Sequence, residues 1–184
     1  MFYSRLRDAL TAAETGRADH PLELVNAPGP TRTHGTELLA RYHGEEIDII
    51  LSHVYLRSTE PDPDLRAARR EVPLNPRHAA SLDILWELGP ARTGIELFYT
   101  GRQALEHNPY RESGPPYLLW GALLDWALTD RLRAFVNAEN LGDVRQTAHE
   151  PLVRRARDAA GRWTIDAWGP LEGRTVNAGL RVIF

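Results

Sequence analysis

The carboxyl-terminal stretch Arg174–Phe184, RTVNAGLRVIF, alternates between apolar and polar or small side chains with a period of two residues. One set points to one side: Val176, Ala178, Leu180, Val182 and Phe184. The intervening set points to the other side and holds Thr175, Asn177, Gly179 and Arg181, with Ile183 as the one apolar exception. A period of two is typical of a strand, whereas an amphipathic helix repeats every 3.6 residues. The chain is therefore expected to end in an amphipathic β-strand.

The same alternation recurs upstream, and the 13 prolines and 14 glycines are spread over the whole chain, which argues against long helices. The sequence predicts an all-β fold with eight antiparallel strands. Their expected bounds are Phe2–Arg7, Leu22–Tyr42, Ile47–Arg57, Arg77–Leu88, Arg92–Gln103, Tyr117–Leu128, Arg131–Leu141 and Arg174–Phe184.

The connections between these strands alternate strictly between short and long. The short ones are residues 43–46, 89–91 and 129–130, and the long ones are residues 8–21, 58–76, 104–116 and 142–173. Bacterial outer-membrane barrels have short periplasmic turns and long external loops, so the pattern predicts up-and-down transmembrane β-barrel strands. The segment Asn26–Pro30 interrupts the second strand with two prolines, and we interpret it as a bulge or an irregularity at the outer rim. If it is a true turn, an extra strand appears and this argument weakens.

The bulk composition excludes several classes of protein. A formal net charge of −3 and a pI near 6.2 give no basic patch for nucleic acid. The absence of cysteine rules out disulfides and thiolate metal sites. The mean hydropathy is −0.41, and no stretch approaches the roughly 18 apolar residues of a spanning helix. A barrel strand needs only about 10 residues, of which alternate ones face lipid, so low hydropathy fits a barrel.

Few residues suggest a specific role. Terminal Phe184, with the apolar set of the last strand, predicts the aromatic signature that the barrel-assembly machinery binds. Amphipathic rings favour the membrane interface, which makes Trp86, Tyr99, Tyr117, Trp120 and Trp126 candidates for an aromatic girdle. Charged residues on the other side of the strands predict a wet or plugged lumen. The seven histidines form no metal motif. We expect no catalytic residues, no metal site and no cofactor, although His107 beside Glu106, and His149 beside Glu150, lie in long loops where a metal complex could reach them.

Four segments resemble those of TonB-dependent receptor barrels. Thr33–Leu38, THGTEL, resembles their Gly-x-Glu-Leu strand, and Pro73–His78 resembles a Pro-x-x-Pro-x-His lead into a strand. Phe135–Asp143, FVNAENLGD, is similar to their penultimate strand, and Gly173–Phe184 is similar to their last one. The order and spacing of these segments carry the resemblance, which covers essentially the whole chain.

The resemblance implies a barrel of about 22 strands whose lumen is closed by an amino-terminal plug. It also implies a receptor in the cell outer membrane that imports a ferric siderophore, cobalamin or a similar scarce nutrient, with energy arriving through TonB. We expect residues 1–184 to form a carboxyl-terminal barrel segment without the plug, the TonB box, a signal peptide or about fourteen of the strands. The expected partners are the lipid bilayer, the barrel-assembly machinery, a small-molecule or metal-complex ligand, and TonB only through a plug region that this sequence lacks.

Two other functions stay open from the sequence. Eight strands can close, so the chain could be a complete small outer-membrane barrel with a structural or adhesive role. A soluble β-barrel with an apolar interior would show the same alternation with its polar side in water. Nothing in the loop composition identifies a transported ligand.

Overall fold

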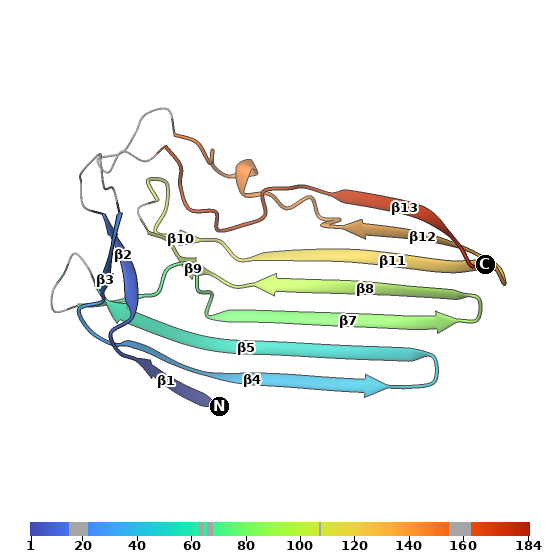
Figure 1. Cartoon of the computed structure of the whole chain (residues 1–184), viewed down its shortest axis with the longest axis horizontal. Coiled ribbons are helices and arrows are strands. Elements are labelled where there is room, and N and C mark those ends of the chain that lie inside the picture. The colour runs from blue at the N-terminus through green and yellow to red at the C-terminus, as the bar shows by residue number, and fades with distance from the viewer. Residues whose placement is uncertain (15–21, 63–64, 66–67, 107, 155–162) are drawn as a thin grey trace.

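The computed structural model describes residues 1–14, 22–62, 65, 68–106, 108–154 and 163–184. Its main body is one antiparallel sheet in which each wall strand pairs with its neighbours in the sequence (Figure 1). In spatial order, the wall strands are β1 (Phe2–Leu6), β4 (Thr31–His43), β5 (Ile47–Pro61), β7 (His78–Leu88), β8 (Ala91–Thr100), β11 (Tyr117–Thr129), β12 (Leu132–Glu139) and β13 (Thr175–Val182). These are the eight strands that the sequence predicts, which confirms an all-β, up-and-down antiparallel fold.

The two ends of the sheet differ as the sequence predicts. The turns β4–β5, β7–β8 and β11–β12 lie at one edge, which is also the edge where the chain ends after β13 (Figure 1). The turns β7–β8 and β11–β12 each leave two residues between their strands, and Gly89 in the first has a φ of 61°, a left-handed conformation that glycine adopts without strain. The described parts of the long connections lie at the opposite edge (Figure 1). The alternation of short turns and long loops is therefore a property of the folded chain.

The second predicted strand needs a correction, because Leu22–Tyr42 is not continuous. Its first part forms β3 (Leu22–Asn26), which pairs with β2 (Leu10–Glu14) in a separate two-stranded sheet. Pro28 and Pro30 have no backbone N–H to donate to a ladder, so the wall strand starts only at Thr31. Thr31 lies opposite Leu6 of β1, so the extra hairpin belongs to the loop and leaves the alternation intact.

The other long connections also contain short strands that sequence analysis did not predict. β6 (Arg69–Glu71) pairs with the end of β5, which extends beyond its predicted limit to Pro61. β9 (Gln103–Ala104) pairs with β10 (Ser113–Gly114), so the predicted strand Arg92–Gln103 ends at Thr100. A single 3₁₀ turn, η1 (Gln146–Ala148), lies in the last connection. No helix among the described residues is long and apolar enough to cross a membrane.

The register places apolar side chains on one face across the whole sheet. One row, for example, runs through Ile49, Ile84, Ile95, Ala122, Ala138 and Val176. Cross-strand partners lie on the same face, so the even-numbered residues of β4, β7, β11, β12 and β13 share this face with the odd-numbered residues of β1, β5 and β8. We call it the apolar face. The opposite face, which carries most of the wall's charged side chains, is the polar face.

The sheet has no apolar core of its own. The only buried hydrophobic residues in the described part of the chain are Ile165 and Trp168, and both lie in the last long connection. Large side chains of the wall such as Leu38, Trp126 and Leu180 are exposed instead. The described strand order ends at β1 and β13, which do not pair with each other. The eight strands thus form an open sheet, so the alternative of a complete, closed eight-stranded barrel, which the sequence left open, does not fit this structure.

Candidate functional site

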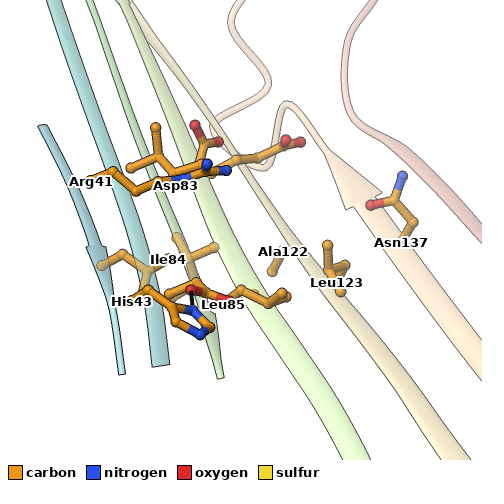
Figure 2. A pocket seen from close by; sticks show the side chains of 13 residues that line it. Arg41, His43, Asp83, Ile84, Leu85, Ala122, Leu123 and Asn137 are labelled. Carbon is orange, nitrogen blue, oxygen red and sulfur yellow. Dashed lines mark hydrogen bonds and ion pairs between the residues drawn. The ribbon is translucent and has the colours of Figure 1, made fainter. Parts of the chain in front are cut away.

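The middle of the polar face is hollowed between β4 and β12, and the concavity has a volume of about 520 Å³ (Figure 2). Its charged and polar lining comes from alternate positions of neighbouring strands. These residues are Arg41 and His43 of β4, Asp48 of β5, Asp83 of β7, Glu96 of β8 and Asn137 of β12. Figure 2 shows Arg41 and Asp83 on one side of the concavity and Asn137 across from them. The predicted polar side of the strands is therefore concave, as the lumen side of a barrel is.

Two carboxylates, Asp83 and Glu96, lie side by side in this concavity, whose lining also includes apolar residues such as Ile50, Leu85 and Leu123. Asp83 and Glu96 are direct cross-strand partners, and the wall continues through Gly121 towards Glu139, to which the side-chain amide of Asn137 donates a hydrogen bond of 2.7 Å. Gly121 has a steric reason to be glycine. A Cβ there would lie 2.9 Å from both the Glu96 carboxylate and the Ala138 carbonyl oxygen. Because Gly121 has no side chain, the Glu96 carboxylate can lie directly against the backbone of β11.

The short-turn end of the polar face carries paired charges instead. Arg133 of β12 donates a 2.6 Å hydrogen bond to Asp125 of β11, and Arg92 forms an ion pair with Glu87 across β7 and β8. Arg181 of β13, the cross-strand partner of Arg133, lies beside them. The five groups Glu87, Arg92, Asp125, Arg133 and Arg181 together carry a net charge of only +1, so this rim is polar without a large net charge.

The long-loop end contains a buried polar cluster centred on Glu150. Trp168 donates its indole N–H to the Glu150 carboxylate at 2.5 Å, Asn108 donates its side-chain amide at 3.0 Å, and Arg111 donates through Nε at 2.7 Å. The side chain of Glu150 is 1% exposed. These contacts join the connection before β11 to the connection before β13, and we call the group the loop cluster.

Gln146 completes the loop cluster from the 3₁₀ turn. It is fully buried, its side-chain oxygen accepts from the backbone N–H of Trp168 at 2.8 Å, and its amide donates to the carbonyl of Asp166 at 2.7 Å. Gln103 of β9 donates to the Trp168 carbonyl at 2.5 Å. Every one of these polar groups therefore has a partner, as buried polar groups require. Sequence analysis missed the cluster, because its members are separated by up to 65 residues and form no local motif.

Two carboxylates at this end of the molecule, those of Glu150 and Asp143, have a pKa below the ordinary value. Burial alone would raise the pKa of Glu150, but the hydrogen bonds from Trp168, Asn108 and Arg111 lower it below its ordinary value. A backbone hydrogen bond from Arg174 lowers the pKa of Asp143 against a smaller opposing effect of burial. Both carboxylates are thus held in the charged form, which suits an anchoring role better than proton transfer.

The possible metal-contacting loop residues fall into different settings. His107 lies outside the described residues. The ring centroid of His149 lies 6.0 Å from that of Trp168, and the Glu150 carboxylate accepts hydrogen bonds within the loop cluster. The described residues contain no group of three or more His, Cys, Asp or Glu that could hold a metal ion.

The predicted aromatic girdle residues divide between the two faces. Trp86 and Trp126 lie on the apolar face near the short turns, and Tyr99 and Trp120 lie on it towards the long loops. Tyr117 is a correction, because it lies opposite Thr100 on the polar face. Its position is odd-numbered in β11, whereas the apolar positions of that strand are even. The distance of Tyr117 from the strand end suggested the girdle, but its odd-numbered position in β11 places it on the polar face.

The last strand places its predicted apolar set as expected. Val176, Ala178, Leu180 and Val182 lie opposite Ala138, Val136, Ala134 and Leu132 of β12, all on the apolar face. The ladder ends at Val182, although the backbone N–H of Ile183 still donates to Arg131. Phe184 lies beyond the ladder and is fully exposed.

A comparison of the sequence with models of known protein families finds one match. The model of the family described as "TonB dependent receptor-like, beta-barrel" matches residues 1–141. No curated protein sequence matches the chain.

Solved structures of receptors and transporters are similar in fold. The ferric yersiniabactin uptake receptor FyuA from Yersinia pestis matches with a TM-score of 0.68 and 19% identity over 99% of this chain and 26% of FyuA. The ferric-catecholate import receptor Fiu from E. coli K12 matches with a TM-score of 0.63 and 13% identity over 97% of this chain and 24% of Fiu. The copper transporter OprC matches with a TM-score of 0.61 and 18% identity over 97% of this chain and 27% of OprC. The chain therefore spans about a quarter of the length of these proteins.

Proposed function

This chain belongs to the TonB-dependent receptor-like β-barrel family, and from that premise we propose that it builds the carboxyl-terminal part of the wall of an outer-membrane receptor barrel. The receptor takes up a scarce nutrient, in the first instance a ferric siderophore or a similar metal complex. The observation that carries the proposal is the uncovered apolar face, which is in register across the strands while the other face is charged and concave.

The dimensions of the apolar face support a membrane as its environment. Along β8, Tyr99 and Ala91 are eight residues apart, which is about 26 Å at roughly 3.3 Å per residue before allowance for strand tilt. The apolar band of outer-membrane barrels is about 25 Å tall. Within this band the wall residues of the apolar face include no Asp, Glu, Lys or Arg, among the residues that the structure describes. In water such a face would be a large aggregation surface, whereas in lipid it is the ordinary outside of a barrel.

Four features take their roles from this proposal. Trp86, Tyr99, Trp120 and Trp126 form part of the aromatic girdles at the two interfaces. Phe184, with the apolar set of β13, is the signal for the barrel-assembly machinery. The polar face looks into the lumen and the loop cluster lies at the external mouth, so these are the parts that meet the ligand and a plug. Residues 1–184 act as one barrel segment, which reaches TonB only through a plug and is not an enzyme.

The ligand class rests on the matched proteins, which are a ferric-catecholate import receptor, a ferric yersiniabactin uptake receptor and a copper transporter. The test is uptake. A strain in which the gene is deleted should lose growth on one ferric siderophore as the sole iron source, and the gene should restore it. Normal growth of the deletion strain on every iron and copper complex tried would refute the proposed substrate class.

A second test addresses the orientation of the wall. The chain has no cysteine, so single cysteines can be introduced without background. A cysteine at Glu96 on the polar face should react in intact outer membranes with a water-soluble maleimide, whereas one at Leu97 on the apolar face should stay unreacted. Equal labelling at both positions would show that lipid does not cover the apolar face.

A further inference from the structure

The apolar face changes character abruptly towards the long loops. Between the short turns and the Tyr55–His78 row it carries no acidic or basic residue other than His53, in the described part of the wall. Beyond that row, Arg57 of β5 lies opposite His34 of β4, and Arg32 of β4 lies opposite Arg5 of β1. We call Arg5, Arg32, His34 and Arg57 the basic rim.

The basic rim is compact and unneutralised. Its four side chains occupy two adjacent rows on three neighbouring strands, where cross-strand partners have Cβ atoms roughly 5 Å apart. All four residues are exposed. Arg5, Arg32 and Arg57 form no ion pair or hydrogen bond with any described side chain. Like charges directly opposite each other destabilise a ladder, and an anion bridging the two rows would remove that repulsion.

The neighbouring acidic groups do not supply this anion. Glu71 of β6 lies opposite Thr59 on the same face, but it is already bound to Arg77, whose pKa its hydrogen bond and its charge raise. The other residue of this strand near the rim, Arg69, is itself a cation. It donates hydrogen bonds to the Thr59 hydroxyl and, at 3.0 Å, to the Pro30 carbonyl. The positive charge of the basic rim is therefore open to a ligand from outside the chain.

We propose that the basic rim binds the phosphate groups of membrane lipids at the external interface. This inference rests on the proposed orientation of the wall. A lipid offers two matching parts, because its acyl chains cover the apolar face while its headgroup reaches the level where that face becomes basic. Arginine suits this role, since its planar guanidinium donates two parallel hydrogen bonds to phosphate oxygens. The opposite, short-turn end of the apolar face has no such group: Leu88, Ala91, Trp126 and Val182 occupy it.

The test compares lipids that share acyl chains. The full chain, purified from membranes in a non-ionic detergent, is mixed with micelles containing equal amounts of dioleoylphosphatidic acid and dioleoylphosphatidylcholine, and the retained lipids are counted by native mass spectrometry. The unmodified chain should retain phosphatidic acid preferentially. The triple variant R5Q/R32Q/R57Q should lose this preference by on the order of 100-fold, since each arginine near an anionic surface is worth roughly a fivefold change in binding. Raising NaCl from low concentration to 1 M should weaken it in the unmodified chain as well.

A matched control removes the same charge from the polar face. The variant R41Q/R92Q/R181Q should keep the preference for phosphatidic acid. Absence of preference in the unmodified chain, or equal loss in both triple variants, would overturn the proposal. Displacement of the lipid by millimolar inorganic phosphate would also overturn it, because the site would then bind free phosphate.

Failure of the lipid-binding proposal can be told apart from failure of the proposed barrel function. A chain that stays soluble without detergent would refute the barrel itself, whereas a detergent-requiring chain without lipid preference would refute only the lipid site. If the triple variant fails to fold, the single variant R57Q and the salt dependence of the unmodified chain give the same decision.

Discussion

Placing one charge on either face of the sheet tests whether lipid covers the apolar face. Ile95 of β8 is the midpoint between Ala91 and Tyr99, about 13 Å along the strand from each, and it lies between Ile84 and Ala122 in the ladder. An arginine at the midplane of an outer-membrane barrel, on the lipid side, costs about 2–4 kcal/mol. We therefore expect I95R to lower the equilibrium between folded and unfolded chain by about 30- to 900-fold.

The matched control is Leu123→Arg on the polar face. Leu123 lies opposite Gly94, one residue before Ile95, and both Leu123 and Ile95 are 38% exposed in the isolated chain. In water the two substitutions would therefore cost similar amounts. The measurement is urea unfolding in phosphatidylcholine vesicles, followed by tryptophan fluorescence, with the slope against urea checked for constancy. A shift of the midpoint for I95R alone supports the assignment of faces. Equal shifts, or a larger shift for L123R, would refute it.

Four further predictions concern the loops, the wall and the chain end. The variant E150Q should expose the connections before β11 and β13 to trypsin at Arg111, because the loop cluster loses its charge-assisted hydrogen bonds; an unchanged cleavage rate relative to the exposed control E172Q would contradict this. Since the pKa of Glu150 is lowered in the folded chain, its stabilisation is complete above the ordinary pKa of glutamate, near 4.3, and is lost as pH falls through the lower folded value. The protection of the Trp168 amide from hydrogen exchange, taken relative to the intrinsic exchange rate at each pH, should therefore fall in that acid range, and E150Q should abolish this fall. G121V should destabilise the wall by roughly 1–3 kcal/mol in the same urea assay, because its side chain would displace the Glu96 carboxylate and meet the Ala138 carbonyl; a loss no larger than that of A122V would argue against the steric role. Deletion of Phe184 should slow assembly into the outer membrane, seen as less heat-modifiable protein after a pulse, and an unaltered rate would remove its role as a signal.

The sequence predicted the wall well because its pattern is local. Alternation with a period of two marks each strand separately, and turn residues such as Gly89 mark the ends of hairpins. The strand bounds differ from the predicted ones by a few residues, except at Asn26–Pro30. There the alternation continues on both sides of the prolines, but only the backbone hydrogen bonds decide which partner each part takes. Periodicity cannot supply that information.

The loop cluster shows what the sequence alone does not contain. Glu150 and Gln146 are polar residues in a long connection, where a solvated position is the ordinary expectation. Their burial depends on Asn108, Arg111 and Trp168, which approach only after the wall has placed two loops side by side. The basic rim needed the register as well, because its members come from three strands and meet only through cross-strand pairing. In both cases the deciding quantity is a distance between residues far apart in the sequence.

The pairing of each wall strand with its sequence neighbours also affects how such a chain can change over evolutionary time. Because every hairpin makes its own ladder, contact order within the wall stays low, and a connection can lengthen without altering the register of the strands that it joins. The connection that holds the β2–β3 hairpin is an example of such a long connection, because the strands on either side of it, β1 and β4, remain partners. The wall therefore tolerates variation at its mouth. A family of receptors built this way can diversify the ligands it accepts while inheriting one unchanged frame.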